Sequence, residues 1–579
     1  MKKKWIISAG GGSFTSTDSN ELTNLQSSLG CPLPIARLLL ERGIKTPEEA
    51  RKFFKPDLSH LHDPFLFANM EKAVARIKHA IEKEEKILIY GDYDVDGTTS
   101  TAILIMGLRE LGAYVDFYIP NRLIDGYGLS ASGNRAIKSK KAKLVITVDC
   151  GISAVNEIQD LQESGIEVIV TDHHTPRETL PNAYAILDPM VENVSYPYKE
   201  LAGVGMAFKL LTALFYELAP QKIEHVYNYL DFVGLGTIAD IVPLNGENRI
   251  LASFGIKKLE ERGNLGLSLL LELAGLKSVK LKSSDIVFKL APRINAAGRL
   301  SSAKKAVTLM ITQEAKEAEK LARSIHAENQ KRQQIDQQTF LEACEMVEAK
   351  YPDLDQTFFI VLTADHWHPG VIGIVASMIV EKYNRPTILF TLSNGEKVGS
   401  GRSIYNFDLF ECLSTLQDYL VTFGGHKYAA GLSILPEYLD VFEEKLNEYA
   451  SKRLSLEDIQ PQLHISQEIN LSEINEILLD WLELFAPFGP QNMNPVFVSK
   501  DAIVVGYPYT VGSNHLKIKI MQHNAVLDLI GFQMGDLLPF LQKGTKVDIV
   551  YSLEKNEWQN VSRIQGKLKD IRPHQPTEI

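Results

Sequence analysis

The sequence predicts a multidomain α/β protein: a domain built on a largely parallel sheet, a long bridging helix, a smaller α/β domain and a C-terminal β-barrel. Three observations support this fold class. Short β-rich runs alternate with helical stretches from Lys86 to about Leu244. Residues 312–350 contain no Gly or Pro and are dense in Glu, Lys, Gln and Ala. From about Leu463 onward, short alternating strands return.

The first α/β segment contains the runs expected of buried parallel strands. Residues 87–90, 144–148 and 168–170 are apolar or β-branched, which is typical of strands covered on both faces. Residues 100–111 have the length of a helix and lie between the first two strands. Strands that alternate with helices in this way indicate a parallel sheet.

The polar stretch at 312–350 has only a sparse apolar stripe, and such helices usually bridge domains. Beyond it, residues 358–362 and 387–390 predict strands. Residues 371–383 predict a helix that ends before Pro386. A second, smaller α/β domain follows from this order.

The C-terminal part predicts a small barrel, with an OB-fold as its expected form. In residues 516–520 apolar residues stand at every second position, so Lys517 and Lys519 share a solvated face. Residues 547–551 predict a further strand. The basic face is either an ordinary solvated surface or a surface that binds a nucleic-acid strand.

Length and composition narrow the class of protein. With 579 residues, of which 45% are apolar and 23% charged, two to four domains are expected. The apolar stretch after Met1 stops at Ser8, and no window approaches the ~20 apolar residues of a membrane helix. We therefore expect no secretion signal and no membrane contact.

Cysteine usage and charge add two further limits. The cysteines form no C-x-x-C pair, which argues against a zinc knuckle or a disulfide framework and fits a cytoplasmic protein; they are Cys31, Cys150, Cys344 and Cys412. The net charge of −11 argues against bulk attraction to duplex DNA. A local basic groove can still bind phosphates, so charge leaves nucleic-acid binding open.

The strongest chemical signal is the run of carboxylates in residues 90–97, YGDYDVDG. Asp92, Asp94 and Asp96 stand at alternate positions where an apolar strand ends and a helix begins, and alternate side chains of an extended backbone share a face. Ionised together, they repel one another unless a divalent cation neutralises them. The alternative is a solvated Asp/Gly turn.

Two further strand ends are acidic, which favours the metal interpretation. Asp149 follows the strand at 144–148, and Asp172, His173 and His174 follow the strand at 168–170. Ligands of open α/β sheets gather at the carboxyl ends of the strands. Oxygen and imidazole donors without thiolates suit Mn²⁺ or Mg²⁺, and two such ions would make a phosphoryl-transfer site.

An Asp-x-Asp strand end, a lone strand-end Asp and an Asp-His-His triplet, in this order, resemble the DHH phosphoesterase superfamily. Residues 236–240, GTIAD, resemble its last acidic motif. The resemblance implies that His174 contacts the scissile phosphate, that Asp149 bridges the metals and that Asp92 is a further catalytic residue. The metal ligands that it implies are Asp94, Asp96, Asp149, His173 and Asp240.

The first acidic motif differs from that of some members of the superfamily, and this difference indicates the branch. Members that act on pyrophosphate or cyclic dinucleotides carry His-x-x-x-Asp-x-Asp, but Tyr90 stands at the histidine's position here. Asp92 appears instead, as in RecJ-like exonucleases. Residues 292–299 and 368–376 also resemble RecJ motifs.

Residues 399–403 and 424–431 resemble the DHHA1 domain that follows the DHH domain. Glycines there would let backbone N–H groups approach phosphates closely. Arg402 is the best candidate for a bidentate phosphate contact. The full set of predicted substrate-binding residues is Arg293, Arg299, His368, Ser400, Arg402 and His426.

The resemblance implies an exonuclease specific for single-stranded DNA that releases mononucleotides 5′ to 3′ by two-metal-ion hydrolysis, in DNA repair and recombination. Expected partners are single-stranded DNA, a single-stranded-DNA-binding protein and a helicase. A phosphodiesterase for small nucleotides or short RNA is the alternative enzyme, and a scaffold that binds nucleic acid without catalysis is the alternative class.

The same reasoning predicts five parts of the chain. These are an N-terminal segment packed on the catalytic domain (1–60), the DHH catalytic domain (61–311), the connecting helix (312–350), the DHHA1 domain (351–455) and an OB-like domain that binds nucleic acid (456–579).

Overall fold

The computed structural model describes residues 3–8, 16–121, 128–192, 195–277, 280–393, 395–558 and 561–575. The chain divides into two compact units. The larger unit comprises Leu61–Val242 and Gly246–Gln460, and the smaller unit comprises Met1–His60, Pro243–Asn245 and Pro461–Ile579. None of the described helices has both the length and the apolar character needed to cross a bilayer.

The first sheet of the larger unit has five parallel strands in the order β3-β2-β4-β5-β6. Every residue of β2 and β4 is buried, as expected for central strands with both faces covered. The predicted parallel sheet is confirmed. The strands are β2 (Ile87–Gly91), β3 (Val115–Tyr118), β4 (Leu144–Val148), β5 (Glu167–Thr171) and β6 (Ala185–Leu187).

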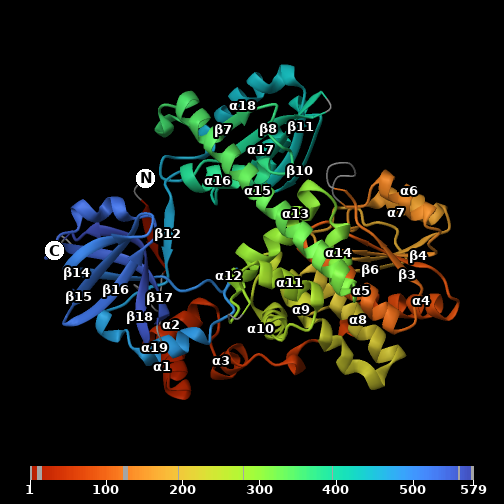
Figure 1. Cartoon of the computed structure of the whole chain (residues 1–579), viewed down its shortest axis with the longest axis horizontal. Helices are drawn as coiled ribbons and strands as arrows, with labels where there is room; N and C mark the ends of the chain where they lie inside the picture. Colours follow the sequence, from red (N-terminus) through yellow and green to blue (C-terminus); the bar gives the residue numbers. More distant parts are fainter. Residues whose placement is uncertain are drawn as a thin grey trace. The chain divides into compact units, whose positions relative to one another are not determined.

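Helices cover both faces of this sheet (Figure 1). On one face, α6 (Ala131–Ser139) and α7 (Val155–Glu163) pack on alternate strand residues such as Leu88 and Val145. The intervening residues point to the opposite face, which α5 (Val95–Glu110) and α8 (Gly203–Leu218) cover. The other helices of this domain are α4 (Met70–Glu82), α9 (Leu230–Ala239), α10 (Gly246–Glu260), α11 (Leu265–Leu273), α12 (Ser283–Asp285), α13 (Ala291–Leu300) and α14 (Lys304–Ile311).

The long polar stretch forms one 36-residue helix, α15 (Ala315–Lys350). It packs on α11, α13 and α14. Near its C-terminal end, Ala343, Cys344 and Val347 join the core of the second α/β domain. The predicted bridging helix is confirmed.

The second α/β domain has a mixed sheet in the order β10-β11-β9-β8-β7, in which β7 and β8 are parallel and the other neighbours are antiparallel. Helix α16 (Ile372–Tyr383) packs on β8 and β9, and α17 (Leu409–Thr415) and α18 (Leu439–Arg453) complete the domain. The strands are β7 (Ile360–Thr363), β8 (Thr387–Ser393), β9 (Glu396–Arg402), β10 (Thr422–His426) and β11 (Ala429–Ile434).

The smaller unit contains the predicted β-barrel. Its sheet follows the order β13-β14-β15-β16-β18-β17, and β14 also pairs with β17, which closes the barrel. The predicted basic strand is β15, in which Leu516, Ile518 and Ile520 are buried. The strands are β13 (Gln467–Glu468), β14 (Phe497–Val511), β15 (His515–Gln522), β16 (Ala525–Gly531), β17 (Lys546–Trp558) and β18 (Val561–Pro573).

The N-terminal segment belongs to the barrel's unit, whereas the sequence suggested that it packs on the catalytic domain. Strand β1 (Lys4–Ile7) pairs in parallel with β12 (Gln462–Ile465). The segment's helices, together with α19 (Glu476–Glu483), join the barrel's core because the apolar side of α2 is buried there. These helices are α1 (Ser16–Leu29), α2 (Leu33–Glu41) and α3 (Pro47–Phe54).

A buried ionic network connects residues 61–63 to α8 and α10 within the larger unit. The Lys209 ammonium donates to Glu247 Oε1 at 2.6 Å and to the His62 carbonyl at 2.7 Å, and the Tyr196 hydroxyl donates to Glu247 Oε2 at 2.6 Å. Both charged side chains are only 2% exposed. Removing one partner of such a buried ion pair strongly destabilises a protein, because the other charge stays buried without compensation.

We predict that Lys209→Met lowers the free energy of unfolding by about 3 kcal/mol or more, because Glu247 is left as a buried charge without its cation. Urea unfolding followed by circular dichroism measures the change. Lys78→Met is the matched control, since the Lys78–Glu217 pair is exposed. Equal unfolding midpoints for the two variants would contradict the assignment of the network as a stabilising one.

Candidate metal centre and phosphate site

The acidic residues predicted from the sequence lie where the parallel strands end. Asp92 follows β2, Asp149 follows β4, and the Asp172-His173-His174 triplet follows β5. Because the strands are parallel, these residues come to one edge of the sheet. We call Asp92, Asp94, Asp96, Asp149 and Asp240, with His173 among them, the carboxylate cluster.

Two of these carboxylates are held by helix N-termini. Asp94 caps α5 by accepting a hydrogen bond from the Gly97 N–H at 3.0 Å. Asp96, in the first turn of α5, accepts hydrogen bonds from the N–H groups of Gly203 (2.6 Å) and Val204 (2.8 Å) at the start of α8. The positive ends of the two helices therefore stabilise negative charge at this edge.

Gly203 lets α8 come this close to the cluster. A Cβ added there would lie 2.9 Å from Asp96 Oδ2 and 2.8 Å from the Asp149 Cβ. Any larger residue would push the helix away from both carboxylates, so the backbone approach requires glycine.

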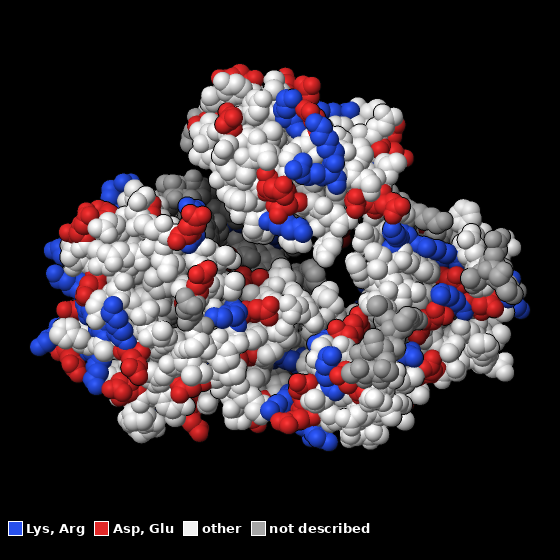
Figure 2. Space-filling view, turned by 180° about the vertical axis from the view of Figure 1, so that it is seen from behind, with Lys and Arg blue, Asp and Glu red and all other residues white. Residues whose placement is uncertain are grey.

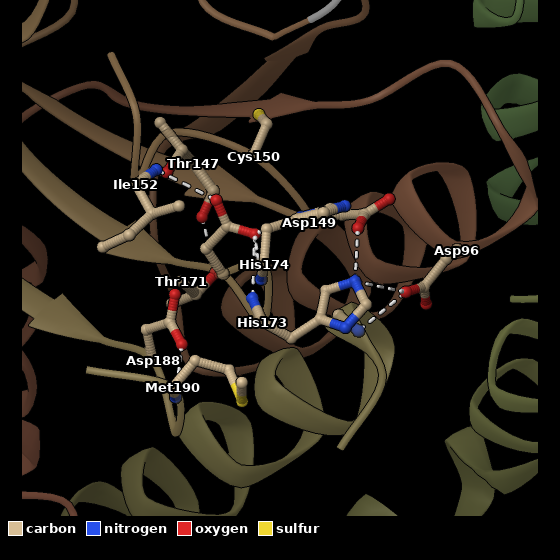
Figure 3. Close-up of polar contacts among 12 residues, drawn as sticks. Asp96, Thr147, Asp149, Cys150, Ile152, Thr171, His173, His174, Asp188 and Met190 are labelled. Atoms are coloured by element: carbon tan, nitrogen blue, oxygen red, sulfur yellow. Dashed lines mark hydrogen bonds and ion pairs between the residues drawn. The ribbon is translucent and has the colours of Figure 1, made fainter. Parts of the chain in front are cut away.

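Asp149 has an unusual backbone conformation, with φ of +59°. This left-handed conformation is uncommon outside glycine, although Asp tolerates it better than most residues. Strained residues cluster at functional sites. The turn directs the Asp149 carboxylate toward His173 (Figure 3).

The His173 ring lies between Asp149 and Asp96 (Figure 3), with its Nε2 3.1 Å from Asp149 Oδ1 and 3.8 Å from Asp96 Oδ2. Asp240 Oδ2 is 3.7 Å from the same nitrogen. Burial lowers the pKa of His173, which favours the neutral imidazole that a metal ion requires. Asp240, at the end of α9, is thus brought to the strand ends from a distant part of the chain.

The donor set fits divalent cations. Burial, and next the charges of neighbouring carboxylates, raise the pKa of Asp96 and Asp149, while burial is the main cause of the raised pKa of Asp240. A divalent ion would relieve this repulsion. Among the residues that the structure describes, three sets have ligand atoms within 4.8 Å of one another: Asp92, Asp94 and Asp149; Asp96, His173 and Asp240; and Asp149, His173 and His174.

His174 is oriented by Asp172. Its Nδ1 lies 2.7 Å from Asp172 Oδ1. Burial alone would lower the pKa of His174, but the hydrogen bond and the charge of Asp172 raise it to about 9. Asp172 also accepts hydrogen bonds from the N–H groups of Ile152 and His173, so its carboxylate is fixed on three sides.

Asp172, the first residue of the Asp-His-His triplet, and Asp188 are buried carboxyls at this edge to which the sequence assigned no role. Asp188 follows β6, accepts a hydrogen bond from the Met190 N–H at 2.7 Å, and has a pKa raised to about 7, mainly by burial (Figure 3). The strand-end rule would have found it, but β6 has only three residues and is hard to recognise in the sequence.

In the second α/β domain, Ser400 and Arg402 lie beside the start of α16. Arg402 Nη1 donates to Ser400 Oγ at 3.1 Å. A Cβ added to Gly373, the second residue of α16, would lie 2.8 Å from Ser400 Oγ and 2.9 Å from Arg402 Nη2. A guanidinium, a hydroxyl and a helix N-terminus side by side form a favourable phosphate site.

His368, Arg299 and His426 lie near these groups. His368 Nδ1 accepts a hydrogen bond from the Gly370 N–H at 3.0 Å, and Arg299 Nη1 donates to the Gly370 carbonyl at 3.1 Å. Burial, followed by the charges of Arg402 and His174, lowers the pKa of His426. His426 therefore lies within electrostatic reach of both the phosphate site and the triplet that follows β5.

Arg293 differs from the other predicted substrate-binding residues. Its guanidinium contacts His326 Nδ1 on α15 at 3.3 Å, the Leu273 carbonyl at 3.5 Å and the Lys289 carbonyl. The described contacts of Arg293 thus place it against α15 and do not include Ser400 or Arg402.

Comparison with known proteins places this architecture in a family. Three family models match the chain: the DHH family, N-terminal domain, at residues 86–237; the DHHA1 domain at 356–452; and the RecJ OB domain at 465–570. The single-stranded-DNA-specific exonuclease RecJ of Bacillus subtilis is 40% identical over 96% of this chain and 70% of its own length. The RecJ of Escherichia coli is 34% identical over 96% of this chain and 98% of its own length.

A solved structure agrees with these matches. RecJ from Thermus thermophilus in complex with Mn²⁺ superposes with a TM-score of 0.82 and 29% sequence identity, covering 99% of this chain and 80% of that one. The parallel-sheet domain, the DHHA1 domain and the OB barrel follow one another in this chain in the order of the family models. The chain therefore belongs to the RecJ family of single-stranded-DNA-specific exonucleases, enzymes of the DHH superfamily.

Proposed function

We propose that this enzyme hydrolyses single-stranded DNA from its 5′ end, releases 5′ mononucleotides and acts in DNA repair and recombination. The observation that supports this most is the carboxylate cluster around His173, at the strand ends of a RecJ-family fold. Family membership supports the substrate class, and the chemistry of the cluster supports phosphodiester hydrolysis.

The proposed metal ligands are Asp94, Asp96, Asp149, His173 and Asp240, with Asp92 close enough to join them. Asp149 belongs to two of the three ligand sets, which supports a bridging role. Two Mn²⁺ or Mg²⁺ ions bound there would supply Lewis-acid activation of the scissile phosphate and of the attacking water.

The remaining residues bind and orient the strand. His174, protonated and held by Asp172, donates a hydrogen bond to a non-bridging oxygen of the scissile phosphate. Ser400 and Arg402 of β9, beside the start of α16, hold the terminal phosphate, and His368, His426 and Arg299 lie near it. The terminal nucleotide then lies between two phosphate contacts, and such positioning contributes a large part of the rate.

We assign catalysis to residues 61–311 and binding of the 5′ end of the DNA to residues 351–455. The barrel would bind nucleotides farther from that end. On the face of the chain in Figure 2, acidic and basic side chains are interspersed, so no field of a single sign covers that face. A single-stranded-DNA-binding protein and a helicase, both in the cytoplasm, are the partners that would supply such a substrate.

A phosphodiesterase for small nucleotides is the less favoured candidate. The residue at the position of that branch's histidine, Tyr90, is fully buried, and its hydroxyl donates to the Gly128 carbonyl at 3.0 Å. It therefore contributes no ligand to the carboxylate cluster.

Digestion of single-stranded DNA with Mn²⁺ tests the proposal. We expect mononucleotides to be released from 5′-labelled strands first and blunt duplex to be resistant. Asp149→Asn should lower the rate at least about 1,000-fold, because several kcal/mol of metal-dependent stabilisation are lost. Release of the 3′ label first, or rapid cleavage of duplex or of cyclic dinucleotides alone, would contradict the proposal.

Metal binding should also raise the thermal stability of the protein. Without metal, Asp149→Asn should unfold at a higher temperature than the wild type, because one of several mutually repelling carboxylates is neutralised. Added Mn²⁺ should stabilise the wild type by about 2.7 kcal/mol at 100 times its dissociation constant and the variant much less. Thermal unfolding with EDTA and with Mn²⁺ measures both effects, and Asp160→Asn, on the exposed side of α7, is the control.

The Asp172–His174 pair predicts a pH dependence. His174 is protonated below a pKa of about 9, so activity that needs its proton should fall as the pH rises through this value. Asp172→Asn keeps a hydrogen-bond acceptor but removes the charge that raises this pKa. The alkaline limb of kcat/KM should therefore move to lower pH, and an unmoved limb would show that Asp172 does not set the charge of His174.

A further inference from the structure

The turn between β10 and β11 carries an exposed cation between two aromatic rings. The Lys427 ammonium lies 5.5 Å from the centroid of the Tyr405 ring and 5.3 Å from that of Tyr428. The two tyrosines are 71% and 42% exposed. We call Tyr405, Lys427 and Tyr428 the tyrosine–lysine cluster.

Backbone hydrogen bonds fix this cluster. The Ser403 N–H donates to the Tyr428 carbonyl at 3.0 Å, and the Leu409 N–H donates to the Lys427 carbonyl at 3.0 Å. The turn is therefore bonded to the segment that follows β9, which carries Tyr405. Rings on a backbone held in this way lose little conformational entropy when they bind a ligand.

The cluster lies at the same sheet edge as two phosphate-binding candidates. In the register of the three strands, Ala429 of β11 pairs with Arg402 of β9 on one side and with His426 of β10 on the other. Lys427 and Tyr428 are the two residues between His426 and Ala429, and Tyr405 is three residues after Arg402. If Arg402 and His426 hold a phosphate of single-stranded DNA, the nucleotides beside that phosphate come next to the rings of Tyr405 and Tyr428.

The chemistry of the cluster favours a nucleic-acid strand. Exposed aromatic rings stack on any base because every base has a π-face, and a cation beside them attracts the backbone. An apolar protein partner would instead need a contiguous apolar patch, whereas Lys427 places a charge between the rings.

We propose that Tyr405, Lys427 and Tyr428 form a base-stacking site for one of the first three nucleotides of the DNA strand, adjacent to the terminal phosphate. The proposal rests on the proposed function and deepens it, because it assigns the grip on the end of the substrate to three named side chains. The stacking is tolerant of sequence, since no base edge is read.

Steady-state kinetics on a single-stranded 20-mer test the site. The Tyr405→Ala/Tyr428→Ala double variant should raise KM by about 5- to 10-fold, the lower part of the range for loss of a stacked base, with kcat within about twofold of the wild type. The Tyr405→Phe/Tyr428→Phe double variant, which keeps both rings, should retain the wild-type KM. Tyr438→Ala is the matched control, because Tyr438 is similarly exposed beyond the opposite end of β11.

Substrates with one abasic nucleotide at the first, second or third position separate stacking from a structural effect. An abasic residue at one of these positions should weaken binding to the wild type by the same factor as the double variant does, and should cost the double variant nothing further. Equal abasic penalties in both proteins, or an unchanged KM in the Ala variant, would overturn the inference. Such a result would leave the cluster as a surface for another partner.

Failure of the proposed function is a distinct result. If the wild type cleaves no DNA, fluorescence anisotropy of the same oligonucleotides in EDTA replaces kinetics. The stacking site is then supported if only the Ala double variant binds the intact strand more weakly, and if this difference disappears on the abasic strand. Equal binding by all variants overturns it.

Discussion

The gathering of like charges at one sheet edge is the constraint on which the rest of the larger unit depends. Parallel strands bring Asp92, Asp149 and the β5 triplet together, and α9 adds Asp240. Burial and the charges of neighbouring carboxylates raise the pKa of Asp96 and Asp149, as expected where like charges gather in the absence of a cation. The same repulsion would be relieved by a divalent ion, which would give such an ion its affinity.

Several features of the fold reduce that cost. The N-termini of α5 and α8 point at Asp94 and Asp96, and a glycine allows α8 to come within hydrogen-bond distance. The Asp96 carboxylate thus both caps a helix and faces His173. A change at Gly203 would alter the geometry of the carboxylate cluster, although glycine has no donor atom of its own.

The sequence predicted the parallel sheet, the bridging helix and the acidic strand ends, because each has a local pattern of spacing or composition. It could not predict that Asp96 accepts hydrogen bonds from the first residues of α8, since this contact joins residues 107 positions apart. Asp188 was missed because β6 is too short to show a strand pattern. The placement of residues 1–60 depended on matching apolar surfaces, which sequence patterns do not specify. The Arg402 prediction rested on resemblance, and the structure adds Gly373 and the start of α16 as its surroundings.

The pairing of β1 with β12 has a consequence for synthesis on the ribosome. The first 60 residues belong to one unit with residues that emerge only after position 460, and almost all of the roughly 400 residues between them form the larger unit. At ~5–20 residues per second, the N-terminal helices wait on the order of 20–80 s for the rest of their core. The larger unit therefore has this interval to fold first, before the apolar side of α2 meets its partner residues.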